Sequence, residues 1–243
     1  MGFIFEELLA KIGIETPIRL KQRPFDPLYY KGFSFENTKD YALLMIGAHN
    51  GLKTKYFVRE AAEYGKVCLV EPVPHLFQTL SKTHANLKNV FLINKCVTNA
   101  AAEMVNFFAP TKDANKMQHY GDQLGSLKKE HATDHDKRMV GYIEKIRVPC
   151  ISPARLLNTI NCADINLLYL DTEGHDVEII KNFPFDEIKP KAILFEHKHS
   201  DGTHNLGPKF ARTIGRLNKL GYRLRCVDRE NCLAIHESQS WRG

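Results

Sequence analysis

The chain has 243 residues, 43% of them hydrophobic, and its 34 Lys and Arg against 28 Asp and Glu give a formal net charge of +6. That length and hydrophobic content can bury a core as one domain or as a domain with an extension, which excludes disordered and fibrous proteins. No window approaches the roughly 20 continuous apolar residues that a bilayer-spanning helix needs, and the N-terminus lacks a secretory signal, so we expect a soluble, cytoplasmic protein.

The N-terminal part is expected to be a helical extension. Residues 3–14 have apolar side chains at the i, i+3, i+4 spacing of an amphipathic helix. Three prolines then interrupt regular structure: Pro17, Pro24 and Pro27. We therefore divide the chain into an extension over residues 1–40 and a main domain over residues 41–243. The polar face of the helix is acidic rather than basic, which disfavours a role at a membrane surface.

Strands and helices alternate from residue 41 onwards, which is typical of parallel βαβ units. Seven apolar strands are expected, at residues 42–46, 67–71, 90–94, 167–170, 192–196, 223–227 and 232–235. Helices are expected at residues 53–64, 74–86, 176–182 and 208–220, and one more with Ser152 as its cap and Pro153 as its first residue. The short turn at residues 228–231 predicts an antiparallel hairpin at one edge. The predicted fold is therefore α/β, with a mostly parallel sheet.

Residues 109–145 do not fit this alternation. They are polar and charged and carry three glycines without a sustained period. A connection this long inside a compact domain is typical of a lid or a binding loop. We expect a lid on the substrate side, and an insertion without a role is the alternative.

The cysteines and the basic residues have ordinary structural explanations. The six cysteines are scattered without a close CxxC pair, which favours buried free thiols over disulfides or a zinc site. The densest basic stretch lies within residues 209–225, interleaved with apolar residues at helical spacing, as on a solvated helix face. Nucleic acid is therefore not favoured as a partner, although the positive charge leaves an anionic ligand open.

Two of the predicted strands end in residues suited to a nucleoside cofactor. The first ends in IGAHNG, residues 46–51, whose small residues let backbone approach a ligand closely. The second ends in VEP, where Glu71 could accept hydrogen bonds from both hydroxyls of a ribose. The turn lacks the closely spaced second glycine of the pyrophosphate-binding GxGxxG motif, and no GxxxxGK[ST] loop is present. A cofactor without phosphates, such as S-adenosylmethionine, fits best.

Five segments together resemble a known family. They are IGAHNG, VEP, NKCVTN at residues 94–99, LLYLDTEGHDVEIIK at residues 167–181 and AILFEHK at residues 192–198. Over residues 41–236 this series resembles the FkbM-type methyltransferases, which are S-adenosylmethionine-dependent O-methyltransferases with a seven-stranded Rossmann-like sheet. Its most specific part is the D-x-E-G element with a further acidic residue, formed by Asp171, Glu173, Gly174 and Asp176.

The resemblance implies a set of cofactor contacts. The turn after the first strand would contact the amino-acid end of the cofactor through Gly47, Ala48, His49, Asn50 and Gly51. Glu71, followed by Pro72, would bind the ribose, and the backbone around Cys96 and Val97 would contact the adenine. Asp171 would lie near the sulfonium.

The reaction expected from the resemblance is methyl transfer to a hydroxyl of a saccharide or another small polar metabolite. Such a transfer is an in-line displacement, so the protein must align the acceptor oxygen and remove its proton. Four residues at strand ends are candidates for the base: Asp171, Glu173, Glu196 and His197. The oligomeric state and the identity of the acceptor stay open.

A divalent metal also stays open. A group of polar residues that could hold one consists of His197, His199, Asp201 and His204. Their spacing matches no familiar zinc signature, so we predict no metal ligands there. A hard ion such as magnesium at the acidic residues is an equal alternative.

Two other functions are compatible with the sequence. Met45 stands where the family usually carries an acidic residue, so the chain could keep the fold and bind the cofactor with weak or no catalysis. His49 or Asn50 could instead supply the missing hydrogen bonds. A nucleic-acid methyltransferase is the other alternative, but the NPPY-type signature expected for attack by a base amino group is absent.

Overall fold

The computed structural model describes residues 35–117, 119–202 and 205–238. The helix expected at residues 3–14 lies outside these ranges. A seven-stranded sheet has the order β3-β2-β1-β7-β8-β10-β9. Its strands are β1 (Tyr41–Ile46), β2 (Lys66–Val70), β3 (Val90–Ile93), β7 (Ile165–Leu170), β8 (Ala192–Glu196), β9 (Tyr222–Cys226) and β10 (Asn231–His236). Only β10 runs against its neighbours, so the predicted α/β fold with a C-terminal antiparallel hairpin is confirmed.

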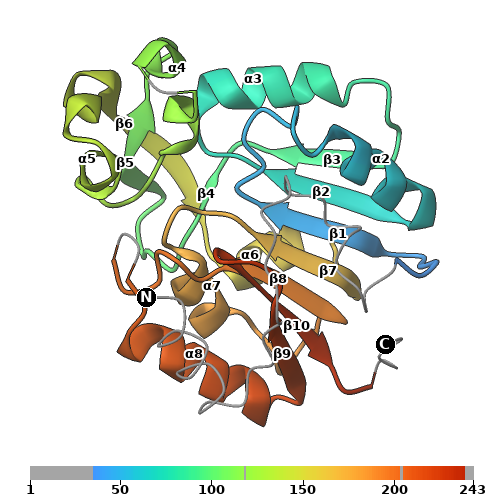
Figure 1. The fold of residues 1–243 in the computed structure, drawn as a ribbon. Coiled ribbons are helices and arrows are strands. Elements are labelled where there is room, and N and C mark those ends of the chain that lie inside the picture. The colour runs from blue at the N-terminus through green and yellow to red at the C-terminus, as the bar shows by residue number, and fades with distance from the viewer. Residues whose placement is uncertain (1–34, 118, 203–204, 239–243) are drawn as a thin grey trace.

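Helices cover both faces of this sheet (Figure 1). They are α2 (Lys55–Tyr64), α3 (Pro74–Thr83), α6 (Pro153–Thr159), α7 (Asp176–Asn182) and α8 (Pro208–Lys219). On one face α2 and α3 contribute Phe57, Val58 and Leu80 to the core, while α6, α7 and α8 bury their apolar residues against the other face. Within the described part of the chain, no helix is long and apolar enough to cross a membrane.

Two of these helices follow directly from local sequence signals. The Ser152 hydroxyl accepts a hydrogen bond from the Arg155 N–H at 3.3 Å, and Pro153 is the first helical residue of α6, as predicted. In α8 Phe210, Ile214 and Leu217 are buried, whereas the basic residues at positions 209, 212, 216 and 219 are exposed. The basic stretch is therefore a solvated helix face, as the spacing indicated.

A second, three-stranded sheet was not predicted. It has the order β4-β6-β5 and consists of β4 (Cys96–Val97), β5 (Met104–Pro110) and β6 (Ile143–Ile151). The segment over residues 109–145, expected as a lid, thus begins inside β5 and ends inside β6. Between them lie α4 (Ala114–Met117), η2 (Gly121–Gln123), α5 (His131–His135) and η3 (Lys137–Tyr142), packed on a small core of their own. We call residues 109–145 the insert.

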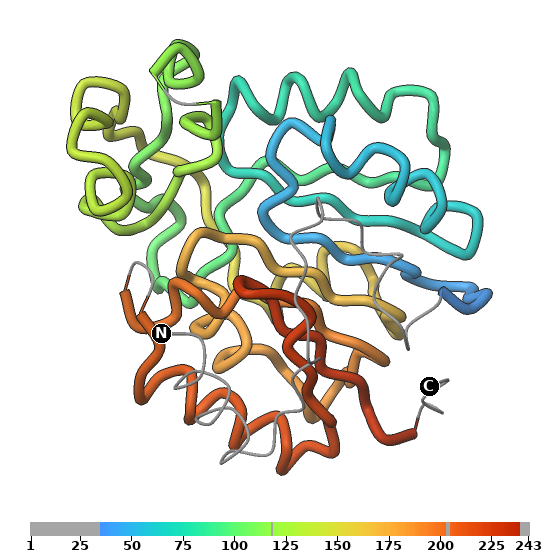
Figure 2. Tube along the Cα trace, viewed as in Figure 1, coloured from blue at the N-terminus to red at the C-terminus, as the bar shows by residue number. Residues whose placement is uncertain are grey.

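The sheet order reverses between β1 and β7, because β2 follows β1 on one side and β8 follows β7 on the other. In open α/β sheets a ligand binds beyond the carboxyl ends of the strands at such a point. The chain trace in Figure 2 shows the insert, coloured green to yellow-green, beyond this edge of the sheet. The insert therefore lies at the end of the sheet where ligands bind in folds of this class.

Candidate functional site

A cavity of about 720 Å³ opens at the carboxyl ends of β1, β2, β7 and β8. Every residue predicted to contact the cofactor lines it: Gly47, Ala48, His49, Asn50, Gly51, Glu71, Pro72, Cys96, Val97 and Asp171. Three of the four candidates for the base line it as well: Asp171, Glu173 and Glu196. The structure therefore brings nearly all of the predicted site residues into a single pocket.

The turn after β1 requires glycine at position 47. Gly47 has a φ of +91°, in the region that L side chains rarely adopt. Its N–H donates to the Val70 carbonyl at 2.9 Å, while the Asp171 N–H donates to the Ile46 carbonyl at 3.0 Å. A Cβ atom at position 47 would lie 1.8 Å from the carbonyl oxygen of Asp171. The turn thus packs directly against the end of β7, next to the cavity.

Glu71 is a buried carboxylate at the end of β2. One of its oxygens accepts a hydrogen bond from the His49 N–H and the other from the Val73 N–H, both at 2.9 Å. Burial raises the pKa of Glu71 to about 7, although these two hydrogen bonds act in the opposite direction. Each carboxylate oxygen has a second lone pair, so Glu71 can accept further hydrogen bonds from a ligand.

Asp171 ends β7 and faces the same cavity. The Tyr169 hydroxyl donates a hydrogen bond to Oδ2 of Asp171 at 3.3 Å. Burial, and then the nearby charge of Glu173, raise the pKa of Asp171 to about 7. Glu173 itself has a φ of +51°, which is uncommon for a residue with a side chain. The end of β7 therefore holds two closely spaced acidic groups in a constrained turn.

Glu196 brings a third acidic group to the cavity from the end of β8. It is 6% exposed, and burial followed by the charge of Glu173 raises its pKa well above the ordinary value. Lys198 lies 3.1 Å from Oε1 of Glu196 and 3.0 Å from Oε2 of Glu230. The sequence reasoning missed Lys198, although it belongs to the AILFEHK segment that contributes to the family resemblance.

Asp176 positions the two strand ends relative to each other. It is fully buried at the start of α7. Its Oδ1 accepts hydrogen bonds from the Thr172 N–H at 2.9 Å and from the Thr172 hydroxyl, and its Oδ2 accepts one from the Glu196 N–H at 2.8 Å. The acidic residue that follows D-x-E-G in the sequence therefore joins the β7 turn to the end of β8.

The remaining candidate for the base, His197, does not line the cavity. It is fully buried, its ring lies 5.4 Å from that of Phe210, and it sits close to Cys226 and Cys232. Successive side chains along an extended chain point to opposite sides. Because Glu196 faces the cavity, His197 points away from it.

A model of the methyltransferase FkbM domain matches residues 46–224 of the chain. The chain belongs to the FkbM methyltransferase family. This membership confirms the predicted family and the predicted enzyme class, a methyltransferase that uses S-adenosylmethionine. A search of curated proteins found no match.

Several solved structures are similar to this FkbM methyltransferase at low sequence identity. The fibrillarin pre-rRNA processing protein of Methanococcus jannaschii is 17% identical, with 90% of this chain and 71% of that chain covered and a TM-score of 0.42. Aeropyrum pernix fibrillarin, solved with natively bound S-adenosylmethionine, is 13% identical, with 82% and 66% covered and a TM-score of 0.41. The O-methyltransferase TomG of Streptomyces achromogenes, involved in tomaymycin synthesis, is 9% identical, with 82% and 74% covered and a TM-score of 0.43.

This FkbM methyltransferase has an apolar residue where an acidic one is usual in the family. Met45 lines the cavity but is only 2% exposed and belongs to the core on the α2 side of the sheet. Nearby, the ring of His49 contacts Asp122 of the insert, with Nε2 lying 3.1 Å from the carbonyl oxygen and 3.4 Å from Oδ2. Asp122 also lines the cavity, so an acidic group is present near the turn, supplied from a distant part of the chain.

The insert contacts the turn after β1 and the turn after β7. Besides the pair between Asp122 and His49, the Ser126 hydroxyl donates to the Glu173 carbonyl at 3.1 Å, and the His131 ring lies 2.8 Å from Oε2 of Glu173. The sequence reasoning named none of these three insert residues. Their partners lie 42 to 73 positions away in the chain. Local sequence patterns cannot predict contacts between residues so far apart.

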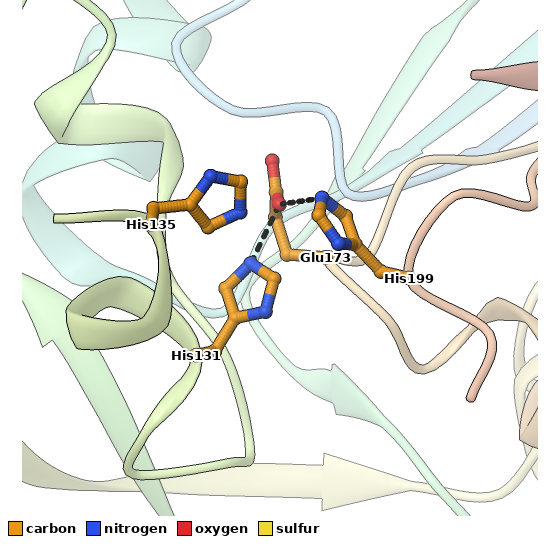
Figure 3. Close-up of side chains that lie close together, drawn as sticks. All are labelled: His131, His135, Glu173 and His199. Carbon is orange, nitrogen blue, oxygen red and sulfur yellow. Dashed lines mark hydrogen bonds and ion pairs between the residues drawn. The ribbon is translucent and has the colours of Figure 1, made fainter. Parts of the chain in front are cut away.

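The structure does not assemble the histidine-rich group that the sequence suggested. His204 lies outside the described residues, and the side chain of His197 points away from the cavity, towards Cys226 and Cys232. The Asp201 carboxylate accepts hydrogen bonds from the N–H groups of residues 207, 209 and 210 at the start of α8. His199 instead lies with His131, His135 and Glu173, three residues that come from the insert and from the β7 turn (Figure 3).

Proposed function

We propose that this chain transfers a methyl group from S-adenosylmethionine to a hydroxyl of a saccharide or another small polar metabolite. The observation that carries the proposal is that one cavity unites all ten predicted cofactor contacts with Asp171, Glu173 and Glu196. A cavity of about 720 Å³ is within the range of pockets that hold small-molecule ligands.

The lining of the cavity fits the cofactor. The close packing of Gly47 on the end of β7 keeps side-chain bulk out of the turn that would hold the amino-acid end. Glu71 is placed to accept hydrogen bonds from ribose hydroxyls, and the short strand β4 (Cys96–Val97) would flank the adenine. When bound, the cofactor supplies a methyl group on a positively charged sulfur, which an oxygen nucleophile can attack.

Asp171 is the residue to which we assign the base. It lies in the cavity at the end of β7, and its Oδ2 already accepts a hydrogen bond from Tyr169. We infer that Oδ1 would take the proton of the acceptor hydroxyl as its oxygen bonds to the methyl carbon and the bond between that carbon and sulfur breaks, which leaves S-adenosylhomocysteine. Asp176 holds the neighbouring backbone in place through Thr172 and Glu196. His197 has no part in this proposal, because its side chain points away from the cavity.

The charges around the cavity favour a hydroxyl-rich, uncharged acceptor. The acidic residues of the lining are Glu71, Asp122, Asp171, Glu173, Glu196, Asp228 and Glu230, and its lysines and arginines are Lys53, Lys95, Lys198 and Arg229. Carboxylates, amides and ammonium groups are all suited to hydrogen bonds with sugar hydroxyls. Seven acidic side chains against four lysines and arginines disfavour the phosphates of a nucleic acid in this cavity. This supports the choice of a saccharide or a small metabolite over RNA or DNA.

The insert is proposed to act as the lid over the acceptor. Its contacts to His49 and Glu173 span the cavity from the β1 turn to the β7 turn.

We also place the reaction in the cytoplasm. All six cysteines are free, which is the state favoured in a reducing compartment.

Isothermal titration calorimetry with S-adenosylhomocysteine tests the cofactor site directly. The wild-type protein is expected to bind, and Glu71→Gln to bind roughly 10- to 100-fold more weakly, because a charge-assisted hydrogen bond contributes about 1.5–3 kcal/mol. Glu63→Gln is the matched control, since Glu63 is exposed on α2 and should leave the affinity unchanged. No binding to the wild-type protein at millimolar ligand would overturn the proposal.

The affinity for S-adenosylhomocysteine is expected to depend on pH through Glu71. Its pKa is raised to about 7, so below that pH the carboxyl is mostly protonated and cannot accept from both ribose hydroxyls without first losing a proton. Affinity should therefore fall as pH falls, by roughly 30-fold between pH 8 and pH 5.5 if only the ionised form binds. Calorimetry across this range is the measurement. In Glu71→Gln the part of the pH dependence of the affinity that is due to Glu71 should vanish. If the affinity of this variant falls with pH as steeply as that of the wild type, another group causes the pH dependence.

A further inference from the structure

We propose that His131, His135, Glu173 and His199 form a binding site for one divalent transition-metal ion, with zinc as the best match. The inference does not rest on the proposed function, because it concerns metal binding in the absence of cofactor and acceptor. Two of the four residues lie on α5 of the insert, one follows β7, and one follows β8.

The four side chains converge on one point. One ligand atom from each residue lies within 4.8 Å of those of the other three. Oε2 of Glu173 is 2.8 Å from Nε2 of His131 and 3.8 Å from Nε2 of His199. Tetrahedral zinc, with bonds of about 2.0 Å to imidazole nitrogen and carboxylate oxygen, needs ligand atoms roughly 3.3 Å apart. These two separations bracket this value and the others are at most 4.8 Å, so side-chain rotations could bring the four ligand atoms to one ion.

The three imidazole rings surround the carboxylate of Glu173 rather than stack on one another (Figure 3). Their centroids are 4.8 to 5.0 Å apart, and the rings are inclined to each other by 69° to 86°. Ordinary edge-to-face aromatic pairs have the same inclination, so the ring angles alone do not indicate a metal. The evidence for a shared centre is that one nitrogen of each ring lies within 4.8 Å of the other two and of a Glu173 oxygen.

The surrounding structure holds these side chains in place. His131 and His135 are one turn apart on α5, which puts them on the same face of the helix. Ala132 anchors that helix in the core of the insert, where it packs with Met139. His131 is 3% and His199 1% exposed, and the Glu173 backbone accepts a hydrogen bond from Ser126. Burial and these supports preorganise the four donors before any ion arrives.

The donor set selects the class of metal. Three imidazole nitrogens and one carboxylate oxygen suit zinc and neighbouring first-row ions, whereas magnesium and calcium prefer sites made of oxygen alone. An ion bound here would link α5 to Glu173, which also lines the cavity. It would therefore fasten the insert to the edge of the sheet beside the acceptor end of the pocket.

Metal titration of the full chain tests the proposal. The protein is stripped with a chelator, exchanged into buffer free of metal, and titrated with zinc chloride and, separately, with cobalt chloride. The wild-type protein is expected to bind one zinc ion per chain, to show the intense visible absorption of tetrahedral cobalt, and to unfold at a higher temperature with zinc than without it. Stoichiometry from elemental analysis and the cobalt spectrum are the primary measurements.

Loss of a residue that hydrogen-bonds a metal ligand typically weakens metal binding ~10–100-fold. His135→Ala and His199→Ala each remove a ligand itself, so each is expected to weaken zinc binding by more than that and to lose the cobalt spectrum. His119→Ala is the matched control, because His119 is an exposed histidine of the same insert. The unfolding temperature of each variant in chelator shows whether it remains folded. Absence of stoichiometric binding by the folded wild-type protein, or equal binding by His135→Ala, His199→Ala and the wild type, would overturn the site. A protein that binds S-adenosylhomocysteine but not zinc would lose this inference and keep the proposed function.

Discussion

Gly47→Ala is expected to destabilise the protein by about 3 kcal/mol or more and to abolish cofactor binding. The new methyl group would lie 1.8 Å from the carbonyl oxygen of Asp171, and the φ of +91° is strained for any residue with a Cβ atom. The obstruction is backbone rather than a flexible side chain, so either the β1 turn or the end of β7 must move. Chemical denaturation measures the loss, which corresponds to a fall of roughly 6–12 °C in melting temperature for a chain of this length.

Gly215→Ala is the matched control for this substitution. Gly215 lies within α8, and a Cβ atom there would meet nothing within 4 Å. Alanine is preferred over glycine inside a helix by about 0.5–1 kcal/mol, so this variant should be slightly more stable than the wild type. Equal stabilities of the two variants would show that the turn after β1 adapts freely and that its packing on β7 does not shape the cofactor site.

The main sheet was predictable because each of its strands has a signal in its own local sequence. Central strands such as β1 and β7 are buried along their whole length and therefore appear in the sequence as continuous apolar runs. The second sheet lacks this signal. In β6 exposed residues alternate with buried or partly buried apolar ones over residues 146–150 instead of forming a continuous apolar run, and β4 has only two residues. Pairing with β5, rather than a hydrophobic run, makes β6 a strand.

The predicted and missed parts of the site divide in the same way. Glu71 and Asp171 directly follow apolar strands, so their convergence at one sheet edge follows from parallel topology. His131 and Asp122 reach the site only through the folding of the insert, whose short helices carry no sustained periodicity. The error about His197 has a simpler cause, because its neighbour Glu196 occupies the side of the chain that faces the cavity.

Asp171→Asn is expected to lower kcat for methyl transfer by roughly 10²- to 10⁴-fold, the usual contribution of a positioned general base. Asparagine keeps the shape of the side chain and can still accept the hydrogen bond from Tyr169, but it cannot take a proton from the acceptor. The measurement is transfer of label from S-adenosylmethionine to the best acceptor found for the wild-type protein in a panel of saccharides and other hydroxyl compounds. The affinity for S-adenosylhomocysteine should change by less than about tenfold, or 1.4 kcal/mol, since Glu71 and the β1 turn remain intact.

Two comparisons make this result specific to Asp171. Asp186→Asn applies the same chemical change to an exposed residue far from the cavity lining and should leave kcat unchanged. Glu196→Gln removes the carboxylate at the end of β8, which is paired with Lys198 and therefore poorly placed to take a proton from the acceptor. Its kcat should fall less than that of Asp171→Asn. The reverse order, with Glu196→Gln inactive and Asp171→Asn active, would move the base from β7 to β8 and make Asp171 a residue that only positions the cofactor.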